Sequence, residues 1–241
     1  MRIFGEPTIV LLDRKNTKLD LMKHLLIIGA RGCGRGTYET ATTMQTYGEV
    51  FDIKGFLDDN TQALDGFEGY PPIIDSVEHY EIQPDDVFIC ALGDVEYKKK
   101  YVQMILDKGG EFMNIIHKTA FVSKYAKLGE GCIIGTFSKI DCNATIDDYT
   151  IIQAHATIGH DSHVGKFSII DCYCFMGGFS DVGECVTMHT RSTLIPAKKI
   201  GDGATINVAS VVIYDVKPNS VMMGNPARRL IIPNIKGDGK A

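Results

Sequence analysis

The sequence predicts two parts of different architecture, an α/β domain with a parallel sheet followed by a β-helical solenoid. Three observations support this prediction. Strand-like apolar runs alternate with helix-compatible stretches in the first half, and an aliphatic residue or Met recurs at every sixth position in the second. The third is size, because 241 residues with 44% hydrophobic and 23% charged side chains suit one large or two modest soluble domains.

The composition argues against several classes of partner. The net charge of −5 leaves no basic excess to neutralise nucleic-acid phosphates. No apolar run approaches the ~18 residues of a membrane helix, and the first residues lack a signal-peptide pattern. The seven cysteines are scattered without a CxxC pair, which favours a reducing compartment. We therefore expect a cytoplasmic protein with no nucleic-acid or membrane partner.

Residues 23–115 form the predicted α/β domain. Strands are expected at 24–28, 50–57, 87–92 and 112–116, with helices from the loop after the first strand to about 47 and over 96–108. Strands that alternate with helices form a parallel sheet, whose ligands bind at the carboxyl ends of the strands. Residues 1–22 are expected to be an extension to which we assign no function, and 233–241 a tail.

Three groups of residues follow the predicted strands. Gly29 to Gly34 form a GxxGxG loop, which differs from the dinucleotide pattern GxGxxG but still lets a ligand approach the backbone. Asp58 and Asp59 end the second strand, and Gly93 follows the third. Asp58 could accept hydrogen bonds from a ribose or a base, or could serve only as a turn or cap residue. The location of all three groups at strand ends favours a binding site.

Residues 116–232 form the predicted solenoid. The residue after each periodic aliphatic is Gly, Asp or Asn in 11 of 17 repeats, and the fourth residue after it is usually small. A six-residue period does not give a helix stripe, but it suits a short strand plus a turn, three of which make one triangular coil. Seventeen repeats give between five and six coils. The aliphatic series is Ile116, Val122, Leu128, Ile134, Ile140, Ile146, Ile152, Ile158, Val164, Ile170, Met176, Val182, Met188, Leu194, Ile200, Ile206 and Val212.

His160 is the candidate general base among five solenoid histidines. It lies beside Asp161, and a carboxylate close to an imidazole can fix its tautomer and strengthen it as a base. The alternative is a surface histidine. A three-histidine zinc site from His155, His160 and either His117 or His189 is a weaker alternative, because the third ligand has no convincing position. We expect no metal, and we expect Cys132 and Cys174, at small-residue positions, to lie in the core.

The order of these motifs resembles one known family over about residues 23–232. It is the bacterial sugar acyltransferase family, which includes sialic-acid O-acetyltransferase-like proteins and the UDP-4-amino-sugar N-acetyltransferase of bacillosamine synthesis. The resemblance implies a Rossmann-like domain that binds a nucleotide-sugar and a left-handed parallel β-helix built from hexapeptide repeats. It also implies a homotrimer with active sites between subunits and acetyl-CoA as cosubstrate.

The resemblance also implies roles for individual residues. The substrate would contact Ala30, Arg31, Gly32, Asp58, Asp59 and Gly93. His160 would be the base with Asp161 as its acidic neighbour, and the Gly178 amide would face the thioester oxygen. Acetyl-CoA would contact Ile169, Thr190 and Val208 along the solenoid of an adjacent subunit. The segment 221–229 resembles the family's closing motif, in which Gly-x-Pro-Ala ends the helix near the coenzyme adenine.

The chain departs from the family pattern at four of these positions. Arg31 and Cys33 stand where better-known members often have Ser and His, Asp161 replaces Glu, and Ile169 replaces a His that touches the coenzyme. The expected reaction is acetylation of an amino group on a nucleotide-linked sugar, and the expected acceptor is a UDP-4-amino-sugar. Acetylation of a sugar hydroxyl and a non-catalytic nucleotide-sugar-binding trimer are the alternatives, and the departures leave the sugar and nucleotide open.

Overall fold

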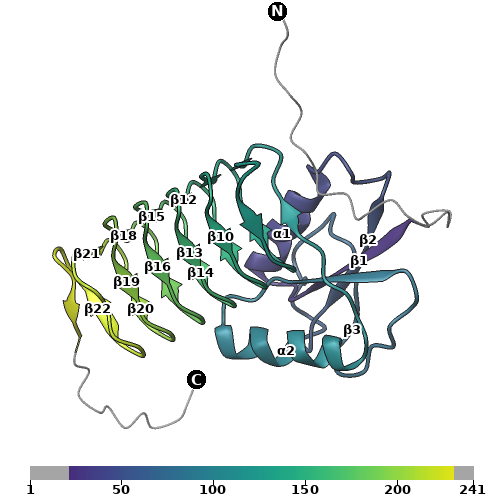
Figure 1. The fold of residues 1–241 in the computed structure, drawn as a ribbon. Coiled ribbons are helices and arrows are strands. Elements are labelled where there is room, and N and C mark those ends of the chain that lie inside the picture. Colours follow the sequence, from purple (N-terminus) through teal and green to yellow (C-terminus); the bar gives the residue numbers. More distant parts are fainter. Residues whose placement is uncertain (1–21, 231–241) are drawn as a thin grey trace, which may run out of the picture.

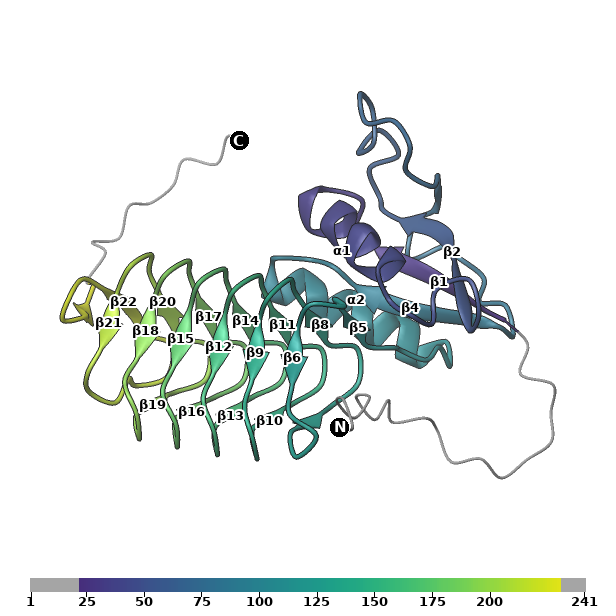
Figure 2. The same cartoon turned by 90° about the horizontal axis from the view of Figure 1, so that it is seen from above.

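The computed structural model describes residues 22–230 and places a small α/β domain against the first coils of a three-sided parallel β-solenoid (Figures 1 and 2). The predicted tail and all but the last residue of the predicted extension lie outside the described residues. Over residues 22–230, the structure has no helix with the length and apolar content needed to cross a membrane.

The α/β domain contains a four-stranded parallel sheet in the order β3-β2-β1-β4. Leu25 and Ile27 of β1 pack on the α1 side of the sheet, whereas Leu26 and Ile28 pack on the α2 side. This alternation follows from the period of two in a strand. The elements are β1 (Lys23–Ile28), α1 (Gly32–Thr42), β2 (Phe51–Leu57), β3 (Ile73–Asp75), β4 (Asp86–Cys90) and α2 (Val95–Asp107).

The observed elements differ from the predicted ones in three places. Helix α1 ends at Thr42 rather than near 47, because the chain turns there and Gly48 takes a positive φ of 79°. The edge strand β3 was not expected, since three partly exposed residues give no periodicity. The strand expected at 112–116 is interrupted, because the Asn114 side chain bonds to the backbone of Gly129 and Cys132 in the first coil.

The solenoid is built from two-residue strands that pair with the strand 18 residues later. The eight-stranded face holds β5 (Ile115–Ile116), β8 (Ile133–Ile134), β11 (Ile151–Ile152), β14 (Ile169–Ile170), β17 (Thr187–Met188), β20 (Thr205–Ile206), β22 (Val221–Met223) and the antiparallel β23 (Arg228–Arg229). The six-stranded face holds β6 (Phe121–Val122), β9 (Lys139–Ile140), β12 (Thr157–Ile158), β15 (Phe175–Met176), β18 (Thr193–Leu194) and β21 (Val211–Val212). The five-stranded face holds β7 (Lys127–Leu128), β10 (Thr145–Ile146), β13 (His163–Val164), β16 (Asp181–Val182) and β19 (Lys199–Ile200).

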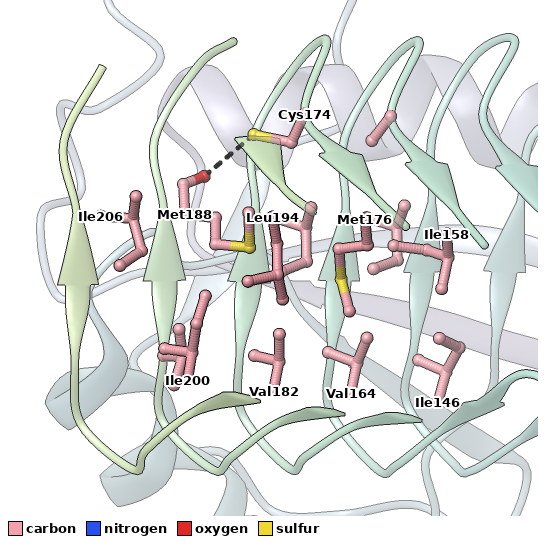
Figure 3. Packing of buried hydrophobic residues seen from close by; sticks show 14 of the residues in the cluster. Ile146, Ile158, Val164, Cys174, Met176, Val182, Met188, Leu194, Ile200 and Ile206 are labelled. Atoms are coloured by element: carbon pink, nitrogen blue, oxygen red, sulfur yellow. Dashed lines mark hydrogen bonds between the residues drawn. The ribbon is translucent and has the colours of Figure 1, made fainter. Parts of the chain in front are cut away.

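The predicted aliphatic series forms the solenoid core. The second residue of each strand points inward, and Figure 3 shows these side chains as stacked rows, one coil behind the next. The small residue at each corner is also buried, as Ser162 and Ser168 illustrate, and their hydroxyls bond to carbonyls of the following coil. Cys132 and Cys174 occupy such positions and are buried, as expected.

The closing motif caps the far end of the solenoid. Strand β22 pairs with β20 after only 16 residues, so the last coil is shorter than the others. Residues 224–227 turn the chain into β23, and Ala227 is buried against the core. This hairpin covers the end of the apolar column, which would otherwise face solvent.

The two domains share one apolar interface. The outward-facing isoleucines of the first four coils, Ile115, Ile133, Ile151 and Ile169, pack with Leu25 and Ile27 of the sheet. On the α2 side, Lys98 is fully buried and its Nζ donates to the Tyr149 carbonyl at 2.9 Å. Burial lowers the pKa of Lys98 to about 8. The junction therefore contains one ammonium group whose charge opposes folding.

We predict a stability increase at alkaline pH that depends on Lys98. Below about pH 8 the folded state holds a buried ammonium group, which costs up to about 3 kcal/mol, and this cost disappears as pH rises toward the unfolded value of 10.5. In thermal unfolding, the Tm of wild type should therefore rise between pH 8 and 10 relative to the Tm of Lys98→Met at the same pH. Lys99→Met, at the exposed neighbour, keeps Lys98, so its Tm should rise with pH as that of wild type does. Parallel pH profiles for wild type and Lys98→Met would show the expectation to be wrong.

Candidate functional site

A cavity lies between helix α1 and one corner of the solenoid. We number the three corners of each coil in chain order. The first corner follows the strand of the eight-stranded face, the second follows the strand of the six-stranded face, and the third follows the strand of the five-stranded face. The cavity of about 630 Å³ is lined by the α1 residues from Gly32 to Thr43 and by first-corner residues from His117 to Thr190. Because Thr43 Oγ1 accepts from the Lys118 amide, the end of α1 lies at the first coil and its start near the later coils.

The residues predicted at the strand ends meet at one edge of the sheet. Asp58 Oδ2 accepts from the Ala30 amide at 2.8 Å, and its Oδ1 accepts from the Asn60 amide. Asp58 therefore holds the glycine loop to the end of β2, which is a structural role compatible with either of the functions expected from the sequence. Asp59 accepts a hydrogen bond from the Tyr101 hydroxyl of α2. Partial burial and this bond raise the pKa of Tyr101, so the phenol stays protonated and donates.

The glycine loop leads into helix α1, and the first residue of the helix is exposed to solvent. Gly34 lies directly against β1, where an added Cβ would come within 1.8 Å of the Gly29 carbonyl oxygen. Arg31, the N-cap residue, and Gly32 are exposed, and Gly93 after β4 is also exposed with nothing within 4 Å of an added Cβ. The loop and the end of β4 therefore leave the backbone accessible at this edge.

His160 and Asp161 form a hydrogen-bonded pair at the second corner. His160 Nδ1 lies 2.8 Å from Asp161 Oδ2, and Asn143, one coil earlier, donates to the other carboxylate oxygen at 3.1 Å. These bonds hold the pKa of Asp161 below its ordinary value, so the carboxylate accepts and Nδ1 carries the hydrogen. This assigns Nε2 as the imidazole nitrogen that is free to take a proton.

Gly178 lies against the free side of the His160 ring. It stands 18 residues after His160, and an added Cβ would come within 2.5 Å of His160 Nε2. The ring of Phe179 meets the imidazole edge-on at 5.1 Å. The Gly178 amide makes no hydrogen bond to any described residue. An unpaired backbone N–H in a residue that packs against the imidazole suits stabilisation of a negatively charged oxygen.

His163 lies on the five-stranded face between two carboxylates. Its Nδ1 is 2.9 Å from Asp181 and its Nε2 is 3.0 Å from Asp147. Partial burial alone would lower the pKa of His163, but the two carboxylate contacts outweigh burial and raise it. Both ring nitrogens must donate in this arrangement, so His163 is a charged clamp between coils rather than a base.

A second imidazole–carboxylate pair lies at the first corner. His189 Nδ1 is 3.0 Å from Asp171 Oδ2, and Asp171 lines the cavity with Cys33 and Thr190. Sequence reasoning missed this pair because it looked only for neighbours in the chain. The signal was available, since Asp171 and His189 occupy the same position of repeats 18 residues apart.

The three residues predicted to contact the coenzyme differ in their exposure to solvent. Thr190 lines the cavity, and Val208 lies one coil further along the same corner with 60% of its surface exposed. Ile169 is only 3% exposed because it packs in the interface between the domains. Its side chain is therefore not available to a coenzyme in this structure.

One chain does not bring all candidate residues together. Of the candidate substrate and coenzyme residues, Gly32 and Thr190 line the cavity, whereas His160, Asp161 and Gly178 lie at the second corner. His155 stacks on Tyr173 at the first corner, so it does not share a site with His160. Over residues 22–230, no group of three or more His, Cys, Asp or Glu side chains is placed to hold a metal ion.

We predict that Gly178→Ala disrupts the His160–Asp161 pair. The new methyl group would overlap the imidazole. The His160 side chain is half-exposed whereas the coil is held by its core, so the ring should leave its position, at a cost of about 1–3 kcal/mol. A crystal structure of the variant should show His160 Nδ1 beyond hydrogen-bond distance of Asp161. Gly36→Ala, where a Cβ meets nothing, is the matched control. An unmoved imidazole in Gly178→Ala would contradict the packing described above.

The sequence matches two family models. Residues 24–105 match the PglD N-terminal domain, and residues 125–160 match the bacterial transferase hexapeptide repeat. Among curated relatives, UDP-N-acetylbacillosamine N-acetyltransferase of Bacillus subtilis is 27% identical over 47% of this chain. An uncharacterized protein of Acanthamoeba polyphaga mimivirus is 31% identical over 42% of this chain. The aligned stretches span 51% and 20% of those two relatives, respectively.

Solved structures match the whole two-part architecture. The acetyltransferase domain of PglB from Neisseria gonorrhoeae has a TM-score of 0.79 and 26% identity, covering 86% of this chain and 100% of that one, and it has also been solved with acetyl coenzyme A. Perosamine N-acetyltransferase from Caulobacter crescentus, solved with CoA and GDP-perosamine, shares the fold with a TM-score of 0.79 and 22% identity, covering 88% and 99% of the two chains. The chain thus joins a PglD N-terminal domain to bacterial transferase hexapeptide repeats, and it shares its fold with acetyltransferases of solved structure.

Proposed function

We propose that the protein transfers the acetyl group of acetyl-CoA to the amino group of a nucleotide-linked sugar. The acceptor in this proposal is a UDP-4-amino-sugar. The observation that carries the proposal is the His160–Asp161 pair with Gly178, whose amide is unpaired among the described residues, packed against the imidazole. This is the set of groups that amide formation from a thioester requires: a base for the amine proton and a donor for the oxyanion. The similarity to N-acetyltransferases of bacillosamine and perosamine supports an amino-sugar acceptor.

The nucleotide-sugar occupies the carboxyl edge of the sheet in this proposal. Of the loop residues, Arg31 and Gly32 are exposed and would present the backbone there, while the buried Ala30 holds the loop through Asp58. Asp58 and Asp59 lie on one side of the loop and Gly93 on the other. From this edge the cavity beside α1 leads along the first corner toward Thr190. The sugar would extend into this cavity, and acetyl-CoA would lie along the corner formed by Thr190 and Val208. Ile169 has no role in the proposal, since it is buried.

The chemistry is a direct transfer without a covalent enzyme intermediate. The neutral amine attacks the thioester carbonyl carbon, a C–N bond forms, and His160 Nε2 takes the proton that the nitrogen loses. The Gly178 amide donates to the resulting oxyanion, while Asp161 stabilises the imidazolium through Nδ1. Collapse of the intermediate breaks the C–S bond, and CoA leaves with the proton returned by the imidazolium. No step requires a metal ion.

A homotrimer completes the site in this proposal. Large aromatic side chains are exposed along the six-stranded face and its two corners, including Phe175 at 45% and Phe179 at 64%. The outward side of the five-stranded face instead carries charged side chains such as Asp181 and Lys199. Burying the aromatic face around a threefold axis would bring the second corner of one subunit to the first corner of the next. His160 would then meet the cavity of its neighbour.

We predict that His160→Ala loses 10²–10⁴-fold in turnover, roughly the contribution of a general base. The measurement is release of free thiol from acetyl-CoA with a panel of UDP- and GDP-linked 4-amino-sugars. His24→Ala is the matched control, because His24 forms a similar pair with Asp52 at 2.7 Å on the opposite edge of the sheet.

Three outcomes would overturn the assignment, once hydroxyl-bearing sugar analogues and direct binding of acetyl-CoA and nucleotide are added to this assay. Near-full turnover by folded His160→Ala would exclude His160 as the base. Turnover only with sugars that offer a hydroxyl in place of the amine would show an O-acetyltransferase. Absence of any turnover and of acetyl-CoA binding, with nucleotide binding intact, would favour a non-catalytic nucleotide-sugar-binding trimer.

A further inference from the structure

Helix α2 carries a stacked pair of tyrosines at the edge of the sheet where β4 ends. The rings of Tyr97 and Tyr101 lie one turn apart, with centroids 6.3 Å apart and planes inclined by 21°. Tyr101 is fixed by its hydrogen bond to Asp59, and Tyr97 is 57% exposed. Tyr97 thus offers an exposed aromatic surface whose position is fixed by its neighbours.

The topology places this pair across the strand-end site. Asp59 follows β2 and the tyrosines follow β4, while β1 with its glycine loop lies between those two strands. The bond from Tyr101 to Asp59 therefore spans the end of β1 on the α2 side. The short connection from the end of β4 to Tyr97 includes Gly93, where an added Cβ would meet nothing within 4 Å.

The helix start holds Tyr97 in this position. Asp94 is the N-cap of α2, and its side chain accepts from the Tyr97 amide at 3.0 Å. The backbone of Tyr97 is thus fixed at the first turn, and its ring is fixed by the stack on Tyr101. Because the backbone and the ring of Tyr97 are already restricted, ligand binding would cost less side-chain entropy.

We propose that Tyr97 is the stacking surface for the base of the nucleotide-sugar, with Tyr101 and Asp59 as its positioning residues. This inference rests on the proposed function, because it assigns the nucleotide to that same edge. An aromatic ring binds the flat face of any base and contributes little to phosphate binding, since its face is electron-rich. Tyr97 would therefore contribute affinity for the base, and the backbone of the glycine loop would remain free for the diphosphate.

Binding titrations of the full chain test the proposal. Isothermal titration calorimetry with UDP, GDP and inorganic pyrophosphate would compare wild type with Tyr97→Ala and Tyr97→Phe. We expect Tyr97→Ala to raise the Kd for UDP and GDP roughly 5- to 100-fold, as expected for one lost base stack, with pyrophosphate unchanged. Tyr97→Phe should restore nucleotide binding, because it keeps the ring. Tyr47→Ala, on the turn that leads into the amino end of β2, is the control.

Thiol release with the turnover substrate distinguishes the two proposals. Unchanged nucleotide Kd in Tyr97→Ala, in an enzyme that still transfers acetyl groups, would overturn the role of Tyr97 and leave the proposed function intact. An equal loss of pyrophosphate and nucleotide binding would also overturn it, since it would indicate a distorted loop. Failure of wild type to bind any nucleotide would overturn both proposals. A raised KM for the nucleotide-sugar with an unchanged KM for acetyl-CoA would support Tyr97 as the base contact.

Discussion

The 18-residue coil of the solenoid is the constraint on which the candidate site depends. Each strand hydrogen-bonds to the strand one coil later, so residues 18 apart are stacked side by side at a fixed position. Asn143 thereby reaches Asp161, and Gly178 lies against His160. The buried column of aliphatic side chains and corner serines keeps this register, because a slip of one residue would turn the aliphatic side chains outward. The positions of the groups around His160 therefore depend on the packing of the solenoid core.

The second constraint is the shared interface between the domains. The outward isoleucines of the first coils and the buried Lys98 fix α1 along the first corner, and this placement creates the cavity. Ile169 illustrates the consequence, since it belongs to this interface rather than to a coenzyme surface. The same placement leaves the second corner, with His160, on another edge of the solenoid. In the proposed trimer, a second copy of the chain would bring the two corners together.

Much of the fold could be predicted because it depends on patterns that are local in the sequence. The six-residue period predicted the inward series from Ile116 to Val212 and the burial of Cys132 and Cys174. The pairing of Asp58 with the Ala30 amide, however, crosses from one strand end to another, and Asp171 with His189 crosses one coil. Such contacts depend on register, which a scan for neighbouring residues does not consider. Strand β3 escaped prediction for the opposite reason, since it is too short to show any period.

Complementation between two inactive variants tests most directly whether the site forms between subunits. His160→Ala leaves the cavity intact, and Gly36→Trp fills the cavity from α1, where an added side chain meets nothing, and leaves His160 intact. Each variant alone should be inactive in thiol release. Random mixed trimers, formed by co-expression, should recover about a quarter of wild-type activity, because about one interface in four would pair an intact cavity with an intact His160. No recovery in mixed trimers would contradict the account and place the complete site within a single subunit.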